Sequence, residues 1–350
     1  MQTLDHAQLE NISIKDFFNS GVVSSVTNSI KWLRQFGLLS SSRACPTCGK
    51  MMTEMPQKST KDGVAWRCKG RSCRTTSSIR KDSFFAKSNL ALTDCITLIF
   101  FWAKDYMSVA QIATELNLTI RTALDWCGFV REICSIELVG RMIGGPGHIV
   151  ALDFALRSPG YRHSIAACEE WVFGGVDTTT NEYFMVMVDN RDADTILPII
   201  SKNIKRGTEI EWRDEGNIPA SANSHPATLR SAFRRPTNEL IGIYPDFGLN
   251  NISPKLKRPR KTTTRKNLIE KYWKQCELQF AEKNGANREF IPSFLEEFMW
   301  RKQHPKKNHF SEIIRAISIL YPQYYAEETV VSSHSEEIAA NVVVADQESS

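Results

Sequence analysis

Between residues 148 and 212, short apolar runs separated by polar turns predict four β-strands. Two of these runs, Trp171–Asp177 and Tyr183–Val188, are rich in aromatic and β-branched residues. The polar turn TTTNE joins them, and such a pair is typical of an antiparallel hairpin. Apolar runs at His148–Asp153 and Thr208–Trp212 predict one strand before the hairpin and one strand after it.

A helix is predicted between the hairpin and the last strand. Asp192 is placed to cap this helix and Gly207 to end it. Apolar residues recur at helical spacing between them, at Ile196, Leu197, Ile199, Ile200 and Ile204. The order strand, strand, strand, helix, strand predicts an α/β domain with a ribonuclease-H-like mixed sheet over residues 148–322. Two later apolar helix faces, around Phe298 and Ile313, are expected to cover this sheet.

The N-terminal part of the chain shows helical patterns. Residues 1–40 predict two short helices, and residues 87–139 predict three. Within the second group, Ser108 is placed to cap a short helix and Thr119 a longer one, with a tight turn at Asn117 between them. A short helix, a turn and a second helix are typical of a helix-turn-helix, whose recognition helix would present Arg121 to DNA. A plain three-helix bundle fits the same pattern. Gly140–Gly147 is then expected to be a linker.

Four of the nine cysteines stand at the spacing of a metal site. The pairs Cys45-x2-Cys48 and Cys68-x4-Cys73 are separated by 19 residues. Two close pairs on turns can bring four thiolates to tetrahedral geometry around Zn²⁺. Residues 41–86 are therefore predicted to form a zinc ribbon with one structural Zn²⁺. The alternative is four unrelated reduced cysteines.

Charge is distributed unevenly along the chain. The formal net charge is +5, but no Lys or Arg follows Arg315, and the last 25 residues hold six acidic residues. Setting those six aside from the 44 basic and 39 acidic residues leaves +11 on the rest. A body this basic is expected to bind a polyanion, here double-stranded DNA. Residues 323–350 are predicted to be a disordered acidic tail.

Basic residues gather around the second cysteine pair. Ser and Thr are interspersed among Lys69, Arg71, Arg74, Arg80 and Lys81, a composition suited to phosphate contacts. A solvated basic surface is the alternative. A second basic run, KLKRPRKTTTRK at residues 255–266, suits a nuclear localisation signal or a strand-binding arm.

The compartment is expected to be intracellular and nuclear. The longest apolar run, Cys95–Ala103, is far short of the ~20 residues that a bilayer requires. The N-terminus has no positive region followed by an apolar stretch, so no secretory signal is predicted. We therefore expect no membrane partner.

Several segments of this sequence occur in the same order in a known protein family. These segments are WVFGG, RDADT followed by LPII, the GT-x-I strand, SIRKDSFF and FLEEFMWRK. Together with the zinc ribbon, they resemble Merlin-type DDE transposases and their bacterial insertion-sequence relatives over roughly residues 15–322. The resemblance implies metal-dependent DNA strand cleavage and strand transfer by a homo-oligomer on DNA.

The resemblance also implies a Mg²⁺ or Mn²⁺ site made of Asp153, Asp214 and Glu270. In such sites one ion activates the attacking oxygen and the other stabilises the leaving oxygen. Asp153 ends the strand HIVALD, and Glu270 matches the acidic residue of the family's I-E-x-x-W helix. Asp214 stands one residue later than the family's second aspartate. Lys274 would substitute for the DNA-contacting lysine of that helix.

Three departures from the family pattern favour an alternative. Phe154 replaces a glutamate, Asp214 is displaced, and Glu277 stands where the family has its DNA-contacting lysine. Residues 215–250 match nothing in the family. The alternative hypothesis is a domesticated or decaying transposase that binds DNA without cutting it.

Overall fold

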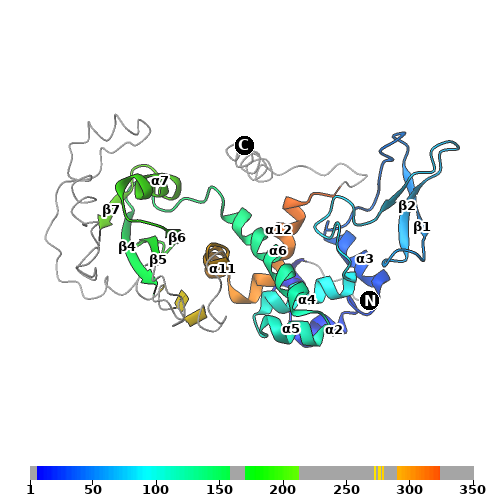
Figure 1. The fold of residues 1–350 in the computed structure, drawn as a ribbon, viewed down its shortest axis with the longest axis horizontal. Coiled ribbons are helices and arrows are strands. Elements are labelled where there is room, and N and C mark those ends of the chain that lie inside the picture. Colours follow the sequence, from blue (N-terminus) through cyan, green and yellow to red (C-terminus); the bar gives the residue numbers. More distant parts are fainter. Residues whose placement is uncertain are drawn as a thin grey trace, which may run out of the picture. The chain divides into compact units, whose positions relative to one another are not determined.

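The computed structural model of this chain describes residues 6–157, 170–212, 272, 275–276, 278–279 and 290–323. The described residues form two compact units (Figure 1). Unit 1 contains the described residues up to Glu137 and those from His304 onward, and unit 2 contains those from Leu138 to Gln303. Unit 2 is thus inserted in the sequence of unit 1. No described helix is long and apolar enough to cross a membrane.

Helices form most of unit 1, and α4 is the most deeply buried of them. They are α1 (His6–Leu9), α2 (Ile14–Asn19), α3 (Val26–Gln35), α4 (Leu92–Lys104), α5 (Val109–Glu115), α6 (Ile120–Leu138) and α12 (His309–Leu320). Every residue of α4 from Cys95 to Lys104 is buried, because its sequence is apolar on nearly all sides. The helix ends at Asp105, which adopts the left-handed conformation that closes a helix.

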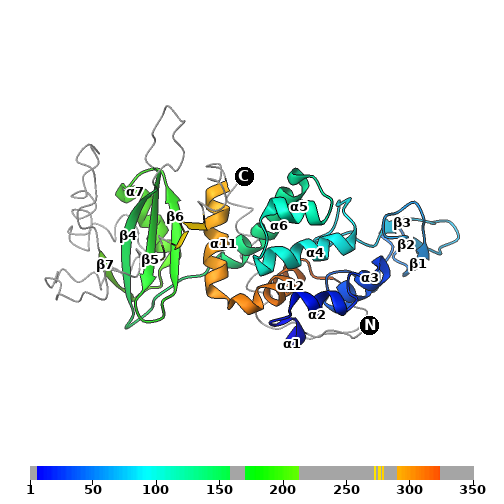
Figure 2. The ribbon, with the colours of Figure 1, turned by 90° about the horizontal axis from the view of Figure 1, so that it is seen from below.

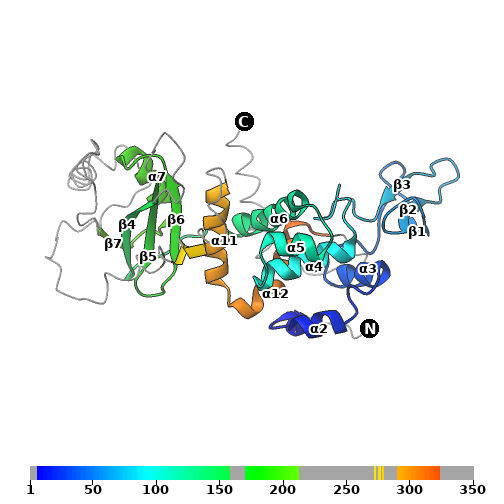
Figure 3. The same cartoon turned by 60° about the horizontal axis from the view of Figure 1, so that its bottom comes forward.

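Helix α12, the last helix of the described residues, packs in the core of unit 1 against α4 (Figure 3). Its Phe310 is fully buried, with ring centroids 5.2 Å from Phe100, 5.7 Å from Phe17 and 6.2 Å from Trp32. The sequence placed this helix in the 148–322 domain as a cover for the sheet, and the structure places it in unit 1 instead. The apolar periodicity of a helix shows that one face is buried, but not which core buries it.

The ribbon of unit 1 is an antiparallel sheet with the order β1-β2-β3. Its strands are β1 (Met52–Pro56), β2 (Val64–Cys68) and β3 (Thr76–Ser78). Arg34 of α3 forms an ion pair with Glu54 of β1, and its guanidinium lies 5.5 Å from the centre of the Trp66 ring. These contacts attach the ribbon sheet to α3.

The segment SIRKDSFF joins the ribbon to the helices. Ile79 and Phe85 are buried within it. The ring of Phe84 lies 5.8 Å from Trp126 of α6 and 5.7 Å from Tyr321, which follows α12. This motif is therefore a packing junction inside unit 1.

Unit 2 contains a four-stranded mixed sheet with the order β6-β5-β4-β7. Its strands are β4 (Ile149–Arg157), β5 (Glu170–Asp177), β6 (Tyr183–Val188) and β7 (Glu209–Trp212). β4 pairs antiparallel with β5, β5 pairs antiparallel with β6, and β7 pairs parallel with β4. The predicted mixed α/β arrangement is confirmed. β4 continues to Arg157, so Asp153 lies within the strand and not at its end.

Two helices pack near β6. α7 (Ala193–Asn203) begins after Asp192, as predicted, but it ends before Ile204, which is already extended. α11 (Ile291–Gln303) runs beside β6 (Figure 2). The backbone N–H of Met185 points at Met299 Sδ, 3.1 Å away. This part of the predicted helical cover over the sheet is present.

The predicted linker packs against the start of β7. Gly144 has φ +82°, and a Cβ there would stand 2.5 Å from Thr208 Oγ1. The Gly145 N–H donates to Thr208 Oγ1 over 2.9 Å, and that hydroxyl donates to the carbonyl of Lys205 over 2.6 Å. The GGPG segment is therefore a docked part of unit 2 in which only glycine fits at residue 144.

Candidate metal centre and nucleic-acid surface

The two cysteine pairs lie on tight turns, each of which contains a glycine. In the first turn, the Gly49 N–H donates to the Cys45 carbonyl over 2.8 Å, and Gly49 has φ +70°. In the second turn, the Gly70 N–H points at Cys68 Sγ, 3.4 Å away. A Cβ at Gly70 would crowd the Cys73 Cβ at 3.3 Å. Both turns therefore fold the chain so that the sulfurs converge.

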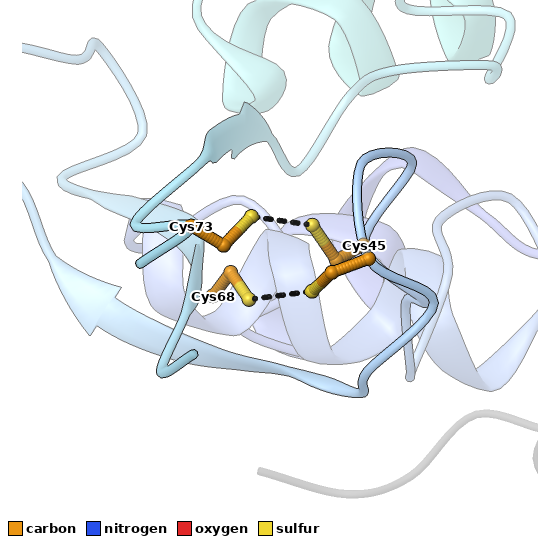
Figure 4. Close-up of side chains that lie close together, drawn as sticks. Cys45, Cys68 and Cys73 are labelled. Atoms are coloured by element: carbon orange, nitrogen blue, oxygen red, sulfur yellow. Dashed lines mark hydrogen bonds between the residues drawn. The ribbon is translucent and has the colours of Figure 1, made fainter. Parts of the chain in front are cut away.

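The four thiol sulfurs form one compact cluster (Figure 4). Cys45 Sγ lies 3.5 Å from Cys73 Sγ, and Cys48 Sγ lies 3.5 Å from Cys68 Sγ. All four sulfurs lie within 4.8 Å of one another. Thiolates about 2.3 Å from a tetrahedral Zn²⁺ stand about 3.8 Å apart, so the cluster fits such an ion. The predicted convergence of the four cysteines is confirmed.

Neighbouring groups shift the pKa values of these thiols in opposite directions. Burial raises the pKa of Cys45, but hydrogen bonds from the backbone N–H groups of Thr47 and Cys48 and from the Cys73 and Cys48 side chains together lower it to about 6. At Cys68 the Gly70 N–H lowers the pKa, but burial and the three neighbouring sulfurs raise it to about 12. Negative charge on one sulfur thus opposes ionisation of the next, and a divalent cation would relieve that repulsion.

The basic residues predicted to contact DNA do not share one environment. Arg71, Arg74 and Lys81 are exposed. Arg80 is buried, and its Nε and Nη2 donate to the two carboxylate oxygens of Asp62 over 2.8 and 2.6 Å. Its Nη1 donates to the carbonyl of Leu90 over 2.7 Å. Arg80 therefore holds the ribbon to the start of α4, and its buried guanidinium is not exposed for the predicted phosphate contact.

The helices predicted to form a helix-turn-helix are present as α5 and α6. Ser108 and Gln111 form a reciprocal capping box at the start of α5, and Asn117 turns the chain with φ 50°. The Thr122 N–H donates to Thr119 Oγ1 over 3.1 Å, so Thr119 caps α6. Arg121 is 84% exposed, and its Nε lies 3.0 Å from the carboxylate of Asp125.

Asp153 lies on β4, an interior strand of the unit 2 sheet. It is opposite Gly174 of β5, which is opposite Met185 of β6. Its Oδ1 accepts a hydrogen bond from the Phe154 N–H over 2.8 Å. Asp214, Glu270 and Lys274 lie outside the described residues.

A second acidic side chain shares the face of Asp153. In the parallel pairing of β4 and β7, Ala151 is opposite Glu211. Side chains two residues apart on a strand point the same way, so Glu211 and Asp153 lie on one face of the sheet. The register of the parallel pairing, which the sequence does not specify, brings Glu211 to this face.

Sequence reasoning also missed a buried pair at the other end of β4. The side chain of Asp177 is fully buried, and its Oδ2 lies 2.7 Å from Nδ1 of His148. Its Oδ1 accepts from the Thr179 N–H over 2.8 Å. Burial raises the pKa of Asp177, but the hydrogen bonds from the Thr179 N–H and from His148 lower it by more. The pKa of Asp177 therefore lies below its ordinary value of 3.8. The pair fixes the β5–β6 turn against the start of β4.

Replacing Asp177 with Asn should destabilise unit 2 by about 1–3 kcal/mol, because buried donors lose an ionised acceptor. The depressed pKa means that this contribution is present above about pH 4 and is lost as the pH falls through the folded-state value. The variant should therefore lose less stability than the wild type on acidification. Urea unfolding midpoints between pH 7 and pH 3 measure this. Asp192→Asn, at an exposed cap without a side-chain hydrogen bond, is the control. Equal acid sensitivity in wild type and D177N would contradict the assignment.

Comparisons of the chain with protein-family models, with curated proteins and with solved structures find no match. What the chain does is therefore inferred from its own residues and their geometry.

Proposed function

We propose that this chain is a DNA-binding protein of the DDE transposase type. In this proposal unit 1 holds duplex DNA, and unit 2 is a ribonuclease-H-like domain that cleaves and transfers DNA strands with Mg²⁺ or Mn²⁺. The protein would act in the nucleus as a homo-oligomer on DNA. The observation that carries the proposal is an acidic residue, Asp153, on an interior strand of a sheet ordered β6-β5-β4-β7.

The topology of the sheet supports a ribonuclease-H-like assignment. Three consecutive antiparallel strands are followed by a helix and by a fourth strand parallel to the first. This is the arrangement expected of that fold, and Asp153 lies on an interior strand of the sheet. Asp153 and Glu211 offer oxygen donors on one face, and oxygen donors are what Mg²⁺ prefers.

Asp153, Asp214 and Glu270 would hold the catalytic ions in this proposal. Bound Mg²⁺ would supply activation of the attacking oxygen and stabilisation of the leaving oxygen. The chain's own contribution is to fix Asp153 in place, through the pairing of β4 with strands on both sides. The Phe154 N–H further orients the Asp153 carboxylate.

The environment of Phe154 bears on the alternative without catalysis. Its ring centroid lies 5.0 Å from that of Phe173, and the Arg191 guanidinium lies 5.8 Å from it. Adjacent residues of a strand point to opposite faces, so Phe154 and Asp153 do not share a face. The change from Glu to Phe therefore removes no oxygen donor from the face of Asp153, and it argues less against catalysis than the displaced Asp214 does.

The cysteine cluster supports Zn²⁺ as the structural ion of unit 1. The four sulfur donors, the tetrahedral spacing and the glycine turns match the requirements of a closed zinc site. Exposed cations on the same turns support a phosphate-binding role for the ribbon.

The test is cleavage of a labelled DNA duplex by the full chain with Mn²⁺. Wild type should nick the DNA, and Asp153→Asn should lower the rate about a hundredfold or more, since metal catalysis contributes several kcal/mol and 1.36 kcal/mol is tenfold. Glu182→Gln, an exposed acid in the β5–β6 turn, should cleave like wild type. Wild type that binds DNA and does not nick it would leave the alternative, binding without catalysis. Nicking that survives Asp153→Asn would contradict the site.

A further inference from the structure

Charge is divided sharply between the two candidate DNA-binding parts of unit 1. Residues 43–87, the ribbon and its junction, hold eleven basic and three acidic residues. Residues 105–138, the α5–α6 region, hold two basic and five acidic residues. The formal charges are therefore +8 and −3. Cations that neutralise DNA phosphates release counterions and so strengthen binding. Of the two regions, only residues 43–87 carry the net positive charge that favours this.

Three cations of residues 43–87 contact acceptor groups of the protein itself. Arg80 pairs with Asp62, Arg43 pairs with Asp82, and the Lys61 ammonium contacts the Asn89 carbonyl. The other eight are exposed and form no ion pair in the described part of the chain. Three of these, Lys58, Lys81 and Lys87, lie outside the cysteine turns. The five that lie in the cysteine turns or directly adjoin them are Lys50, Arg67, Lys69, Arg71 and Arg74.

The metal-binding end of the ribbon is what brings these five cations to the surface. On β2, Trp66 and Cys68 are buried, so the residue between them, Arg67, faces solvent. Lys69 and Arg71 lie in the turn between Cys68 and Cys73, whose sulfurs point inward to the cluster. Lys50 closes the first turn, where its carbonyl accepts from the Cys45 N–H over 2.9 Å.

Hydroxyl donors stand among the same cations. Thr47 Oγ1 of the first turn lies 3.1 Å from Thr75 Oγ1, which follows the second turn. Hydroxyl and guanidinium groups are among the side chains that contact DNA phosphates. In contrast, the one exposed arginine at the start of α6, Arg121, is paired with Asp125.

We propose that the knuckle surface, defined as Lys50, Arg67, Lys69, Arg71 and Arg74, anchors the phosphate backbone of duplex DNA. The α5–α6 region then adds little to the salt-dependent part of the affinity. This inference rests on the proposed DNA-binding function and names the surface that performs it. It makes the structural metal ion the organiser of that surface.

The experiment measures how the affinity of the full chain for a 30-base-pair duplex changes with salt. The slope of log K against log salt is negative, and each lost phosphate contact reduces its magnitude by about 0.9. A triple variant, Arg67→Gln, Lys69→Gln and Arg71→Gln, should therefore reduce the magnitude of the slope by nearly three and the affinity at 0.1 M salt by about a hundredfold or more. Arg121→Gln tests the predicted contact of α6 with DNA, and it should leave the slope unchanged because Arg121 is paired with Asp125.

The metal content of each variant, measured by elemental analysis, shows that the ribbon is intact. A triple variant that retains its metal and the wild-type slope would overturn the inference while leaving DNA binding established. A fall in slope of about 0.9 for Arg121→Gln, the size expected for one lost phosphate contact, would overturn it as well. Failure of the wild type to bind at low salt would instead overturn the proposed function, and the inference with it.

Discussion

A chain that ends at Gln303 should fail to fold unit 1, although it keeps the ribbon and α1 to α6. The missing helix α12 buries Phe310, Ile313, Ile314 and Ile317, each at most 1% exposed. Burying a large apolar side chain contributes about 1.5–3 kcal/mol, so the four together contribute roughly 6–12 kcal/mol. That is comparable with the whole stability of an ordinary domain, about 5–15 kcal/mol.

Limited proteolysis and thermal unfolding of the shortened chain measure this loss. The control is a chain that ends at Gln323, which keeps every described residue of unit 1. Phe310→Ala in the full chain provides a graded version, with an expected cost of about 3–5 kcal/mol because a cavity opens beside Phe17 and Phe100. Protease resistance of residues 6–137 in the Gln303 chain equal to the control would show that α12 is dispensable.

The location of α12 also shows what the sequence could not reveal. Its apolar spacing predicted a helix with one buried face, and the helix is present. Its position in the chain after α11 suggested the same core as α11, but α12 packs against α4, more than two hundred residues earlier. Periodicity reports burial of a face, and the choice between two apolar cores depends on packing that no local pattern encodes.

Arg80 illustrates the same limit for charged residues. In the sequence it is one of several cations near the second cysteine pair, and nothing local separates it from Arg71 or Arg74. Asp62, its partner, lies eighteen residues earlier in the turn between β1 and β2. A buried ion pair of this kind depends on the tertiary fold, so exposure of a basic residue cannot be predicted from composition alone.

The unit 2 strands were predictable because they contain runs of apolar residues rich in β-branched and aromatic side chains. Their pairing was less accessible. The apolar run predicted a strand over His148–Asp153, yet β4 continues to Arg157, and the ring of Phe154 packs on that of Phe173. The neighbour relation between Glu211 and Asp153 follows from the parallel register of β4 and β7, which local pattern does not specify.

The cysteine cluster is the part of the candidate site that sequence predicted most completely. Four ligands on two short turns restrict the possible geometry so strongly that spacing is nearly sufficient. Each turn contains a glycine, and at the second turn a side chain at Gly70 would crowd Cys73 and Cys68.

Removing the metal should therefore unfold the ribbon. Apparent binding free energies of structural Zn²⁺ sites are about 10–16 kcal/mol near neutral pH, and the ribbon sheet of three short strands has few other sources of stability. Cys68→Ser or a strong chelator should abolish binding of one metal ion per chain. Trp66, which is buried in the ribbon sheet, should become exposed to solvent.

Elemental analysis and tryptophan fluorescence of the full chain measure the two effects. Ser72→Ala, an exposed residue beside Cys73 in the same turn, is the matched control and should keep both the metal and the buried Trp66. Acidification should act like chelation, because thiolates bind the ion and protons compete for them. If the knuckle surface is organised by the ion, DNA affinity should fall together with metal content across this series. A ribbon that stays folded and binds DNA unchanged after complete metal removal would show that the cysteines pack without an ion and that the cations of the turns need no metal to face the DNA.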